Sequence, residues 1–174
     1  MRFRSCDWGS AKPFSVGWWA VCPDLYTTPD GSVIPRGAVI RYREWYGAAK
    51  DQSGATKPDT GLKLTAEEVA QGIKERDGGD TIRYGVIDPA AFSQDGGPSI
   101  VERMRINWRR ADNKRVGRRG AMGGWDQMRA RMIGEDLGDP HGQRPMVYIF
   151  STCTDFIRTV PTLQHDKSRP EDLD

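Results

Sequence analysis

The feature that most constrains this chain is the order in which its extended and helical segments follow one another. Three segments near the N-terminus have the apolar and β-branched composition typical of strands: residues 2–7, 14–22 and 37–46. Turn residues separate the first two, which predicts a β-hairpin, and the third is expected to run antiparallel to the second. Residues 48–62 are polar, contain two glycines and a proline, and predict a mobile loop.

The second half of the sequence alternates between helical and extended patterns. A helix is expected to begin at Thr65, because Glu68 lies three positions later and completes a capping box, and to end at residues 77–79. The segments that follow are a strand at 81–87, helices at 99–106 and 125–133, a compact buried strand at 145–150 and a short helix at 153–160. The helix at 125–133 is amphipathic, with Trp125, Met128, Met132 and Ile133 on one side.

Antiparallel strands followed by β-α-β alternation predict an α/β fold with a mixed sheet of five or more strands and helices on both faces. This is the layout of the ribonuclease H-like fold. A length of 174 residues is sufficient for one domain with a substantial core, so we expect a single domain over 1–174 with a loose tail at 163–174.

Composition excludes several classes of protein. No apolar run approaches the roughly 18 residues that cross a bilayer, and no apolar segment of a signal peptide follows Arg2 and Arg4. The three cysteines, Cys6, Cys22 and Cys153, are widely spaced and form no CxxC pair, so they indicate neither a zinc site nor a disulfide framework. A reducing cytosol fits this pattern best.

A basic stretch interrupts the otherwise balanced charge. Between residues 109 and 119 one acid, Asp112, stands among six cations: Arg109, Arg110, Lys114, Arg115, Arg118 and Arg119. A block of this kind often marks a polyanionic partner. From charge alone, a solvated basic loop is an equally good interpretation.

Two of the predicted strands end in a carboxylate, Asp7 and Asp88. Each aspartate alone is a common turn or cap residue. In the predicted fold, however, the first strand is central and the strand at 81–87 lies beside it, which would bring the two carboxylates together. Such a pair repels unless it is neutralised, and Mg²⁺ or Mn²⁺ bound to carboxylate oxygens would neutralise it. Two such ions would serve phosphodiester cleavage.

Four segments carry a resemblance to a known family: DWGSAKPFSVGWWAV, YGVIDPAAF, ADNKRVGRRGAMGGWDQMRARM and the tail KSRPEDLD. In this order and spacing they resemble the C-terminal nuclease domain of the large terminase subunits of tailed bacteriophages. The resemblance places the first motif acid on Asp7 and the second on Asp88. The family's third acid would follow the last residue, so Asp166, Asp172 and Asp174 are the alternatives within this chain.

The resemblance implies a metal-dependent endonuclease that cleaves concatemeric double-stranded DNA with two Mg²⁺ or Mn²⁺ ions. It implies as partners DNA, the terminase ATPase domain, the small terminase subunit and the portal, and no membrane. We expect a monomeric isolated domain in the host cytoplasm. No GxxxxGK[ST] phosphate loop is present, so the chain is expected to be a fragment without the ATPase domain.

Two other interpretations remain open. One is a different nuclease of this fold, either a Holliday-junction resolvase or a ribonuclease H-type enzyme. The other is a non-catalytic module that binds DNA or the portal. Ser10 and Lys12, just after Asp7, could contact a phosphate or have ordinary turn roles, and His141 and His165 fit surface positions.

Overall fold

A computed structural model describes residues 1–114, 117, 121–164 and 167 of the chain. The chain divides into two compact units. The α1 unit comprises residues 2–18 and 44–112, and the α3 unit comprises residue 1, residues 19–43 and the chain from residue 113 onward. Strands β2 (Ser15–Val21) and β5 (Val39–Tyr46) contribute residues to both units.

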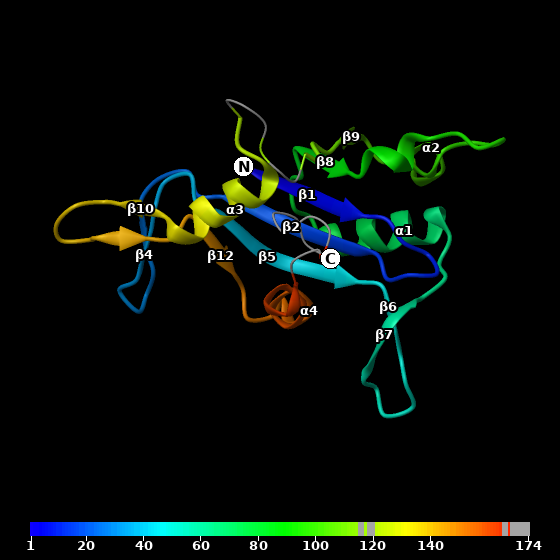
Figure 1. Cartoon of the computed structure of the whole chain (residues 1–174), viewed down its shortest axis with the longest axis horizontal. Coiled ribbons are helices and arrows are strands. Elements are labelled where there is room, and N and C mark those ends of the chain that lie inside the picture. The colour runs from blue at the N-terminus through cyan, green and yellow to red at the C-terminus, as the bar shows by residue number, and fades with distance from the viewer. Residues whose placement is uncertain (115–116, 118–120, 165–166, 168–174) are drawn as a thin grey trace. The chain divides into compact units, whose positions relative to one another are not determined.

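A six-stranded sheet has the strand order β12-β5-β2-β1-β8-β9 (Figure 1). The pairs β1–β8, β8–β9 and β12–β5 are parallel. The backbone N–H of Val21, at the end of β2, donates to the carbonyl of Met1, just before β1, so these neighbours run antiparallel. The N–H of Cys22 donates to the carbonyl of Ala38 before β5, which gives the same relation for β2 and β5. The sheet is therefore mixed, which confirms the predicted ribonuclease H-like layout.

The α1 unit contains strands from the middle and from one edge of the sheet, together with helices and a hairpin. Besides its parts of β2 and β5, these are β1 (Arg2–Asp7), β6 (Ala48–Lys50), β7 (Thr56–Gly61), α1 (Ala66–Asp77), β8 (Tyr84–Ile87), the 3-10 helix η1 (Pro89–Phe92), α2 (Ile100–Met104) and β9 (Trp108–Arg110). Its fully buried side chains include Phe14, Val16, Trp18, Val69, Ile73, Ile87 and Met104. Apolar side chains of strands and helices thus form one core in this unit.

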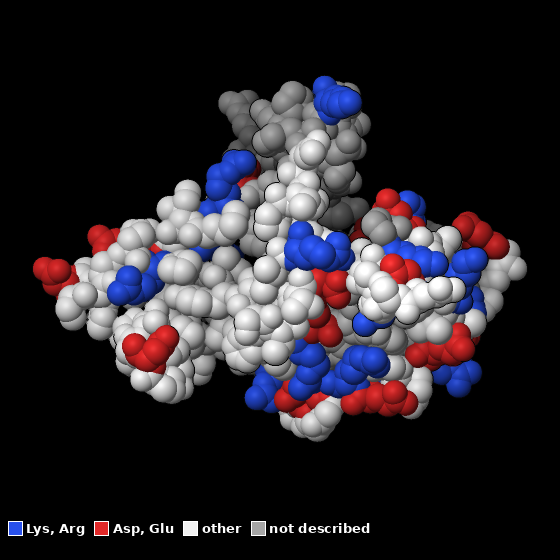
Figure 2. Space-filling view, turned by 90° about the horizontal axis from the view of Figure 1, so that it is seen from below, with Lys and Arg blue, Asp and Glu red and all other residues white. Residues whose placement is uncertain are grey.

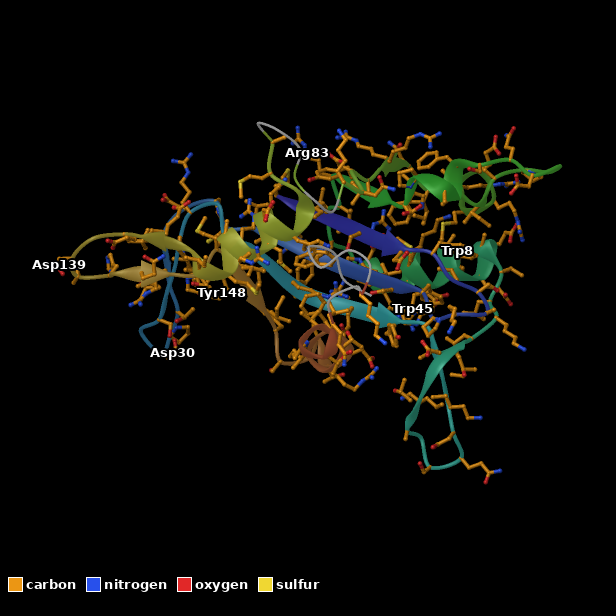
Figure 3. All side chains as sticks on the ribbon, in the orientation of Figure 1. Trp8, Asp30, Trp45, Arg83, Asp139 and Tyr148 are labelled. Carbon is orange, nitrogen blue, oxygen red and sulfur yellow. The ribbon has the colours of Figure 1, made fainter. Side chains whose placement is uncertain are left out.

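Helix α1 begins and ends where the sequence predicts. The hydroxyl of Thr65 accepts from the N–H of Glu68, whose carboxylate accepts from the N–H of Thr65, so the capping box is complete. Gly78 ends the helix in the left-handed conformation, which glycine adopts without steric cost. Within the helix, the ring of Trp45 occupies the space that a Cβ at Gly72 would need, and Trp45 lies beside α1 in Figure 3.

The last residue of α1, Asp77, ties the helix to the sheet. Its carboxylate accepts from the indole N–H of Trp18 at 2.8 Å and from the guanidinium of Arg4 at 3.1 Å. Arg4 is only 8% exposed, and a buried charge is costly unless it is paired. The guanidinium also lies over the ring of Trp108. Side chains from β1, β2 and β9 therefore stand on the face of the sheet that α1 covers.

The α3 unit has a smaller core. Its elements are β3 (Tyr26–Thr27), β4 (Val33–Ile34), α3 (Gly124–Ile133), β10 (Glu135–Asp136), β11 (Gln143–Arg144), β12 (Val147–Ile149), α4 (Thr154–Thr159) and the 3-10 helix η2 (Val160–Thr162). Cys22, Ala38 and Met146 are buried together, with Ile34, Ile40 and Tyr148 packed against them. The hydroxyl of Tyr148, labelled in Figure 3, donates to the carbonyl of Val33.

Several sequence predictions are wrong in detail. Residues 48–62, expected to be a loop, form the antiparallel pair β6–β7. The strands of this pair are largely polar and are joined by backbone hydrogen bonds, which leave no pattern of apolar alternation in the sequence. Arg109 and Arg110 lie on strand β9 and not in a loop. Strand β8 begins at Tyr84, three residues later than expected.

One prediction of burial in the α3 unit, that for the strand at 145–150, is also wrong. Helix α3 forms, but none of its residues is buried, and Met132 and Ile133 are 55% and 65% exposed. Periodicity reports that one face is apolar but not that another element covers it. Strand β12 is half-buried, since it is the outermost strand and pairs only with β5 in the six-stranded order. Among the described residues, no helix has the length and apolar content needed to cross a membrane.

Candidate functional site

The two strand-ending aspartates come together at one edge of the sheet. Strands β1 and β8 are parallel, with Cys6 paired to Ile87, so Asp7 and Asp88 occupy the next positions on adjacent strands. Neighbouring strands lie about 4.8 Å apart. Figure 1 shows β1 and β8 side by side. The carboxyl ends of parallel strands are where α/β folds commonly place their ligand sites.

Alternation along the strands assigns Asp7 to the face opposite α1. Arg4 points toward α1, where it contacts Asp77, whereas Phe3 points to the other face and stacks on Tyr84 with ring centroids 5.3 Å apart. Successive side chains of a strand alternate between faces, so Asp7 follows Phe3 on the face opposite α1. The same alternation along β8 places Asp88 on the face of the sheet that also carries Tyr84.

The electrostatic state of Asp7 reflects this position. Its side chain is exposed, and no hydrogen bond or ion pair joins it to another described residue. Loss of water around the carboxyl raises its pKa above the ordinary value of 3.8, and the negative charge of Asp88 raises it further. The neighbouring thiol of Cys6 is buried, which raises its pKa to about 12, so this cysteine stays protonated at neutral pH. The site therefore contains carboxylate charge without a thiolate.

Asp88 also has a structural role. One carboxylate oxygen, Oδ1, accepts from the N–H of Ala90 at 2.7 Å and caps the 3-10 helix η1. The carbonyl of Pro89 accepts from the guanidinium of Arg110 at 3.1 Å. Capping and metal binding were alternatives at the sequence level, but a carboxylate has two oxygens and one of them is sufficient for the cap.

The tight turn after Asp7 requires a glycine at position 9. A Cβ at Gly9 would lie 2.5 Å from the carbonyl oxygen of Lys12, so no other residue fits this turn without a shift. The carbonyl of Ser10 accepts from the N–H of Lys63, which braces the turn against the end of β7. Lys12 is exposed and lies 3.6 Å from the carboxylate of Asp59, an arrangement that contributes little in water.

Two of the six predicted DNA-binding cations are held near the acid pair. Arg109 pairs in register with Val86, and its guanidinium lies 4.9 Å from the ring centroid of Tyr84, on the face that also carries Asp7. Arg110 packs over Phe92 in η1, 4.3 Å from the ring centroid. Lys114 is exposed. The predictions for Arg115, Arg118 and Arg119 lie outside the described residues.

No third ligand completes the pair within the described part of the chain. No group of three or more His, Cys, Asp or Glu side chains there could hold a metal ion. The alternatives Asp166, Asp172 and Asp174, and also His165, lie outside the described residues. The other histidine, His141, lies in the turn between β10 and β11 in the α3 unit. The contact of Arg110 with the residue after Asp88 was not predicted, because a guanidinium-to-carbonyl hydrogen bond leaves no sequence pattern.

Comparisons with known proteins find solved structures whose fold is similar to that of this chain. No protein-family model and no curated protein matches the chain. The solved structures that match include the large terminase of a thermophilic bacteriophage in two crystal forms, with TM-scores of 0.54 and 0.56 at 14% and 16% identity. A third is the same protein in complex with ATP-γ-S, with a TM-score of 0.55 at 16% identity.

The shared feature is the fold. The matches cover 99% of this chain but only 34–35% of the terminase chain, so the present chain spans about a third of the length of those proteins. At this identity the likeness extends to the path of the backbone and not to individual side chains.

Proposed function

We propose that the chain is a metal-dependent endonuclease domain that hydrolyses double-stranded DNA in a phage packaging motor. The observation that carries the proposal is the meeting of Asp7 and Asp88 at the carboxyl ends of two adjacent parallel strands. The terminase-like fold and the motif resemblance support the same function. In the complete motor the partners would be an ATPase domain, a small terminase subunit and the portal, in the host cytoplasm.

The donor set fits Mg²⁺ or Mn²⁺. These ions prefer oxygen ligands, and Mg²⁺ in phosphate-processing sites is commonly held by one or two carboxylates together with water and substrate phosphate. Asp7 and Asp88 supply two carboxylates. Loss of water around Asp7 and, secondly, the charge of Asp88 raise the pKa of Asp7, and a bound cation would offset both effects. Two bound ions would supply an activated water and stabilise the leaving oxygen in phosphodiester hydrolysis.

The remaining roles belong to the chain itself. Asp7 and Asp88 would bind the ions, while the hydrogen bond from Ala90 holds one oxygen of Asp88 and orients the other. Arg109, on the same face as Asp7, would attract the DNA backbone toward two carboxylates that otherwise repel it. Phosphate contacts of this kind position a duplex without reading its sequence. Cleavage with little sequence preference is therefore expected.

A plasmid-nicking assay with Mn²⁺, Mg²⁺ or excess EDTA tests the proposal. We expect cleavage with either ion, none in EDTA, and at least roughly a hundredfold decrease in rate for Asp7→Asn and Asp88→Asn. Asparagine caps a helix as well as aspartate does, so Asp88→Asn removes the charge and retains the cap. Asp95→Asn, at an exposed aspartate in the loop before α2, is the matched control.

Each result that would contradict the proposal points to a different alternative. Cleavage that persists in EDTA, or that is unchanged in both asparagine variants, would remove the acid pair from the reaction. Preference for a four-way junction or an RNA–DNA hybrid over a duplex would favour a resolvase or a ribonuclease H-type enzyme. Metal-independent DNA binding without cleavage would favour a non-catalytic module, the interpretation that the absence of a three-ligand cluster among the described residues also allows.

A further inference from the structure

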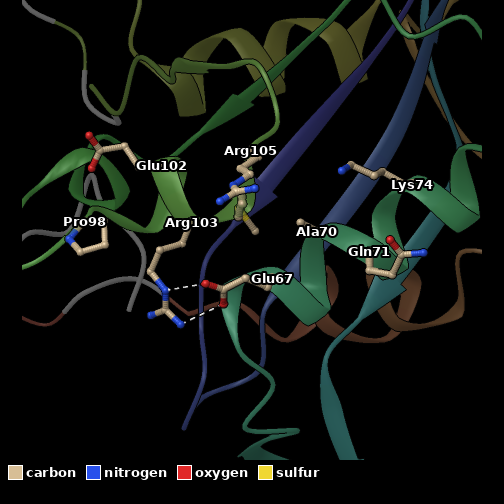
Figure 4. Close-up of a pocket in the computed structure, with 9 residues that line it drawn as sticks. Glu67, Ala70, Gln71, Lys74, Pro98, Glu102, Arg103 and Arg105 are labelled. Atoms are coloured by element: carbon tan, nitrogen blue, oxygen red, sulfur yellow. Dashed lines mark hydrogen bonds and ion pairs between the residues drawn. The ribbon is translucent and has the colours of Figure 1, made fainter.

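A cavity of about 510 Å³ lies between helices α1 and α2, within the α1 unit (Figure 4). Its lining combines apolar residues with charged ones: Glu67, Ala70, Gln71, Lys74, Pro98, Glu102, Arg103, Met104 and Arg105. Ala70 and Met104 are 3% and 1% exposed and form an apolar floor. Helix α1 covers the face of the sheet opposite Asp7, so the cavity is separate from the acid pair. On the face that Figure 2 shows, blue and red side chains are intermixed.

The two carboxylates of the lining are already engaged. Glu67 accepts from Arg103 through both oxygens, from Nε at 3.0 Å and from Nη2 at 2.9 Å, and Figure 4 shows this pair as dashed lines. Glu102 accepts from the backbone N–H of Ser99 and from the side-chain amide of Gln94. These bonds hold both acidic side chains in the wall of the cavity.

The other two cations of the lining, Lys74 and Arg105, differ from Arg103 in this respect. Neither Lys74 nor Arg105 makes an ion pair or a side-chain hydrogen bond with another described residue. In Figure 4 the side chain of Lys74 extends from α1 in the direction of Arg105. Two like charges that line one recess repel each other, and an anionic group between them would turn this repulsion into attraction.

The backbone of Arg105 has a conformation that is uncommon for a residue other than glycine. Arg105 ends α2 in the left-handed conformation, with φ 50° and ψ 37°. Helices usually place glycine there, because a Cβ makes this conformation costly. Arg105 therefore lines the cavity at a backbone cost that a glycine at the same position would avoid.

We propose that this cavity binds an acidic peptide segment of a partner protein, with a carboxylate between Lys74 and Arg105 and an apolar side chain on Ala70 and Met104. The mixed lining favours a peptide over DNA. The fixed carboxylates of Glu67 and Glu102 would repel a continuous polyanion, and a duplex cannot follow its phosphates into a recess between two helices. A short acidic-apolar peptide presents isolated charges beside neutral atoms, which matches the lining.

The test is an NMR titration of the ¹⁵N-labelled full chain with four probes. They are the blocked peptide Asp-Leu-Asp, its neutral analogue Asn-Leu-Asn, inorganic phosphate and a short DNA duplex. We expect the acidic peptide to shift the amide signals of α1 and α2, and the other three to leave these signals unchanged. Equal shifts with the neutral peptide, or shifts at this site with phosphate or duplex instead, would overturn the proposal.

The variant Arg105→Gly distinguishes a loss of peptide binding from a loss of folding. Glycine removes the charge and relieves the left-handed backbone, so this variant should melt at a higher temperature than the wild type yet bind the acidic peptide about tenfold more weakly. Lys63→Gly is the matched control, because Lys63 is also a left-handed cation, with φ 58°, but does not line the cavity. It should gain stability and keep the affinity. Unchanged peptide affinity in both Arg105→Gly and Lys74→Gln would show that these cations are only solvated surface.

Discussion

At the scale of single residues, the negative charge of Asp7 is disfavoured in the folded α1 unit. Its carboxyl is harder to ionise in the folded protein than in an unfolded chain, since surrounding protein and Asp88 both disfavour the charge. Where an acid has a raised native pKa, the folded state binds more protons than the unfolded state between the two pKa values. Stability therefore decreases as the pH rises from 3.8 through the raised value, and the whole penalty is present at neutral pH.

We predict that Asp7→Asn stabilises the metal-free protein at pH 7, by less than about 1 kcal/mol because the side chain is exposed and water screens its charge. The advantage should shrink as the pH falls toward 3.8 and vanish below that value. Thermal unfolding in EDTA across a pH series measures it. Mn²⁺ should reverse the order by stabilising the wild type alone.

Asp95→Asn provides the reference for this series, since it removes an exposed charge elsewhere in the same unit. If Asp7→Asn lowered the melting temperature at pH 7, Asp7 would be a structural turn residue rather than half of a repelling pair. A pH-independent difference would exclude the titration of Asp7 as its cause.

At the scale of elements, Gly72 shows how one position couples a helix to the sheet. The Trp45 ring lies where a side chain at Gly72 would stand, and the guanidinium of Arg76 covers the ring at 3.9 Å from its centroid. Replacing glycine by alanine within a helix ordinarily stabilises by about 0.5–1 kcal/mol. Here the clash reverses the sign, because overpacking costs about 1–3 kcal/mol.

We therefore predict that Gly72→Ala lowers the free energy of unfolding by about 1–2 kcal/mol in urea titration. Gln71→Ala, at the adjacent exposed position of the same helix, should be neutral or slightly stabilising. Adding Trp45→Leu should recover part of the stability in the Gly72→Ala background. An unchanged or increased stability of Gly72→Ala alone would mean that the ring moves aside at no cost.

The elements that sequence predicted well are those with local signals. The capping box at Thr65 and the left-handed Gly78 are set by neighbouring residues, and they define both ends of α1. The exposed hairpin β6–β7 and the short strand β9 were missed, because their pairing depends on partners that are distant or polar. The exposed apolar face of α3 shows the same limit, since burial is decided by what lies opposite.

At the scale of the whole molecule, the predicted site was partly recoverable from sequence. The fold order alone predicted that Asp7 and Asp88 would meet, and the register of β1 and β8 confirms this adjacency. Their role as metal ligands stays a prediction. The fixed positions of Arg109 and Arg110, against Tyr84 and Pro89, depend on three-dimensional contacts that no spacing rule contains.

We predict that the basic stretch sets the salt dependence of DNA binding. Neutralising Arg115, Arg118 and Arg119 together should weaken binding to all sequences alike. The slope of log affinity against log salt should flatten by roughly one unit for each phosphate that the variant no longer neutralises. Stability should hardly change. Binding measured by fluorescence anisotropy in Ca²⁺, which should occupy the site without efficient cleavage, gives the slope.

Lys57→Gln, at an exposed cation on β7, is the control and should leave the slope unchanged. If the triple variant kept the wild-type slope, the stretch would be solvated surface and the DNA would follow another path. A sequence-dependent decrease in affinity would indicate base contacts instead of phosphate contacts.

The pairing of β1 with β8 also has a kinetic consequence. Asp88 lies 81 positions after Asp7, and the pair exists only after a long loop has closed and the intervening helix has docked. Closing such a loop costs conformational entropy before the contacts between the two strands stabilise it. We therefore expect this pairing to form slowly and late in folding. A nascent chain would contain Asp7 without Asp88 while the 81 residues that follow Asp7 are added. Under the proposed function, tight binding of a divalent ion would therefore begin only when assembly of this unit is complete, which would protect the host's DNA from half-made enzyme.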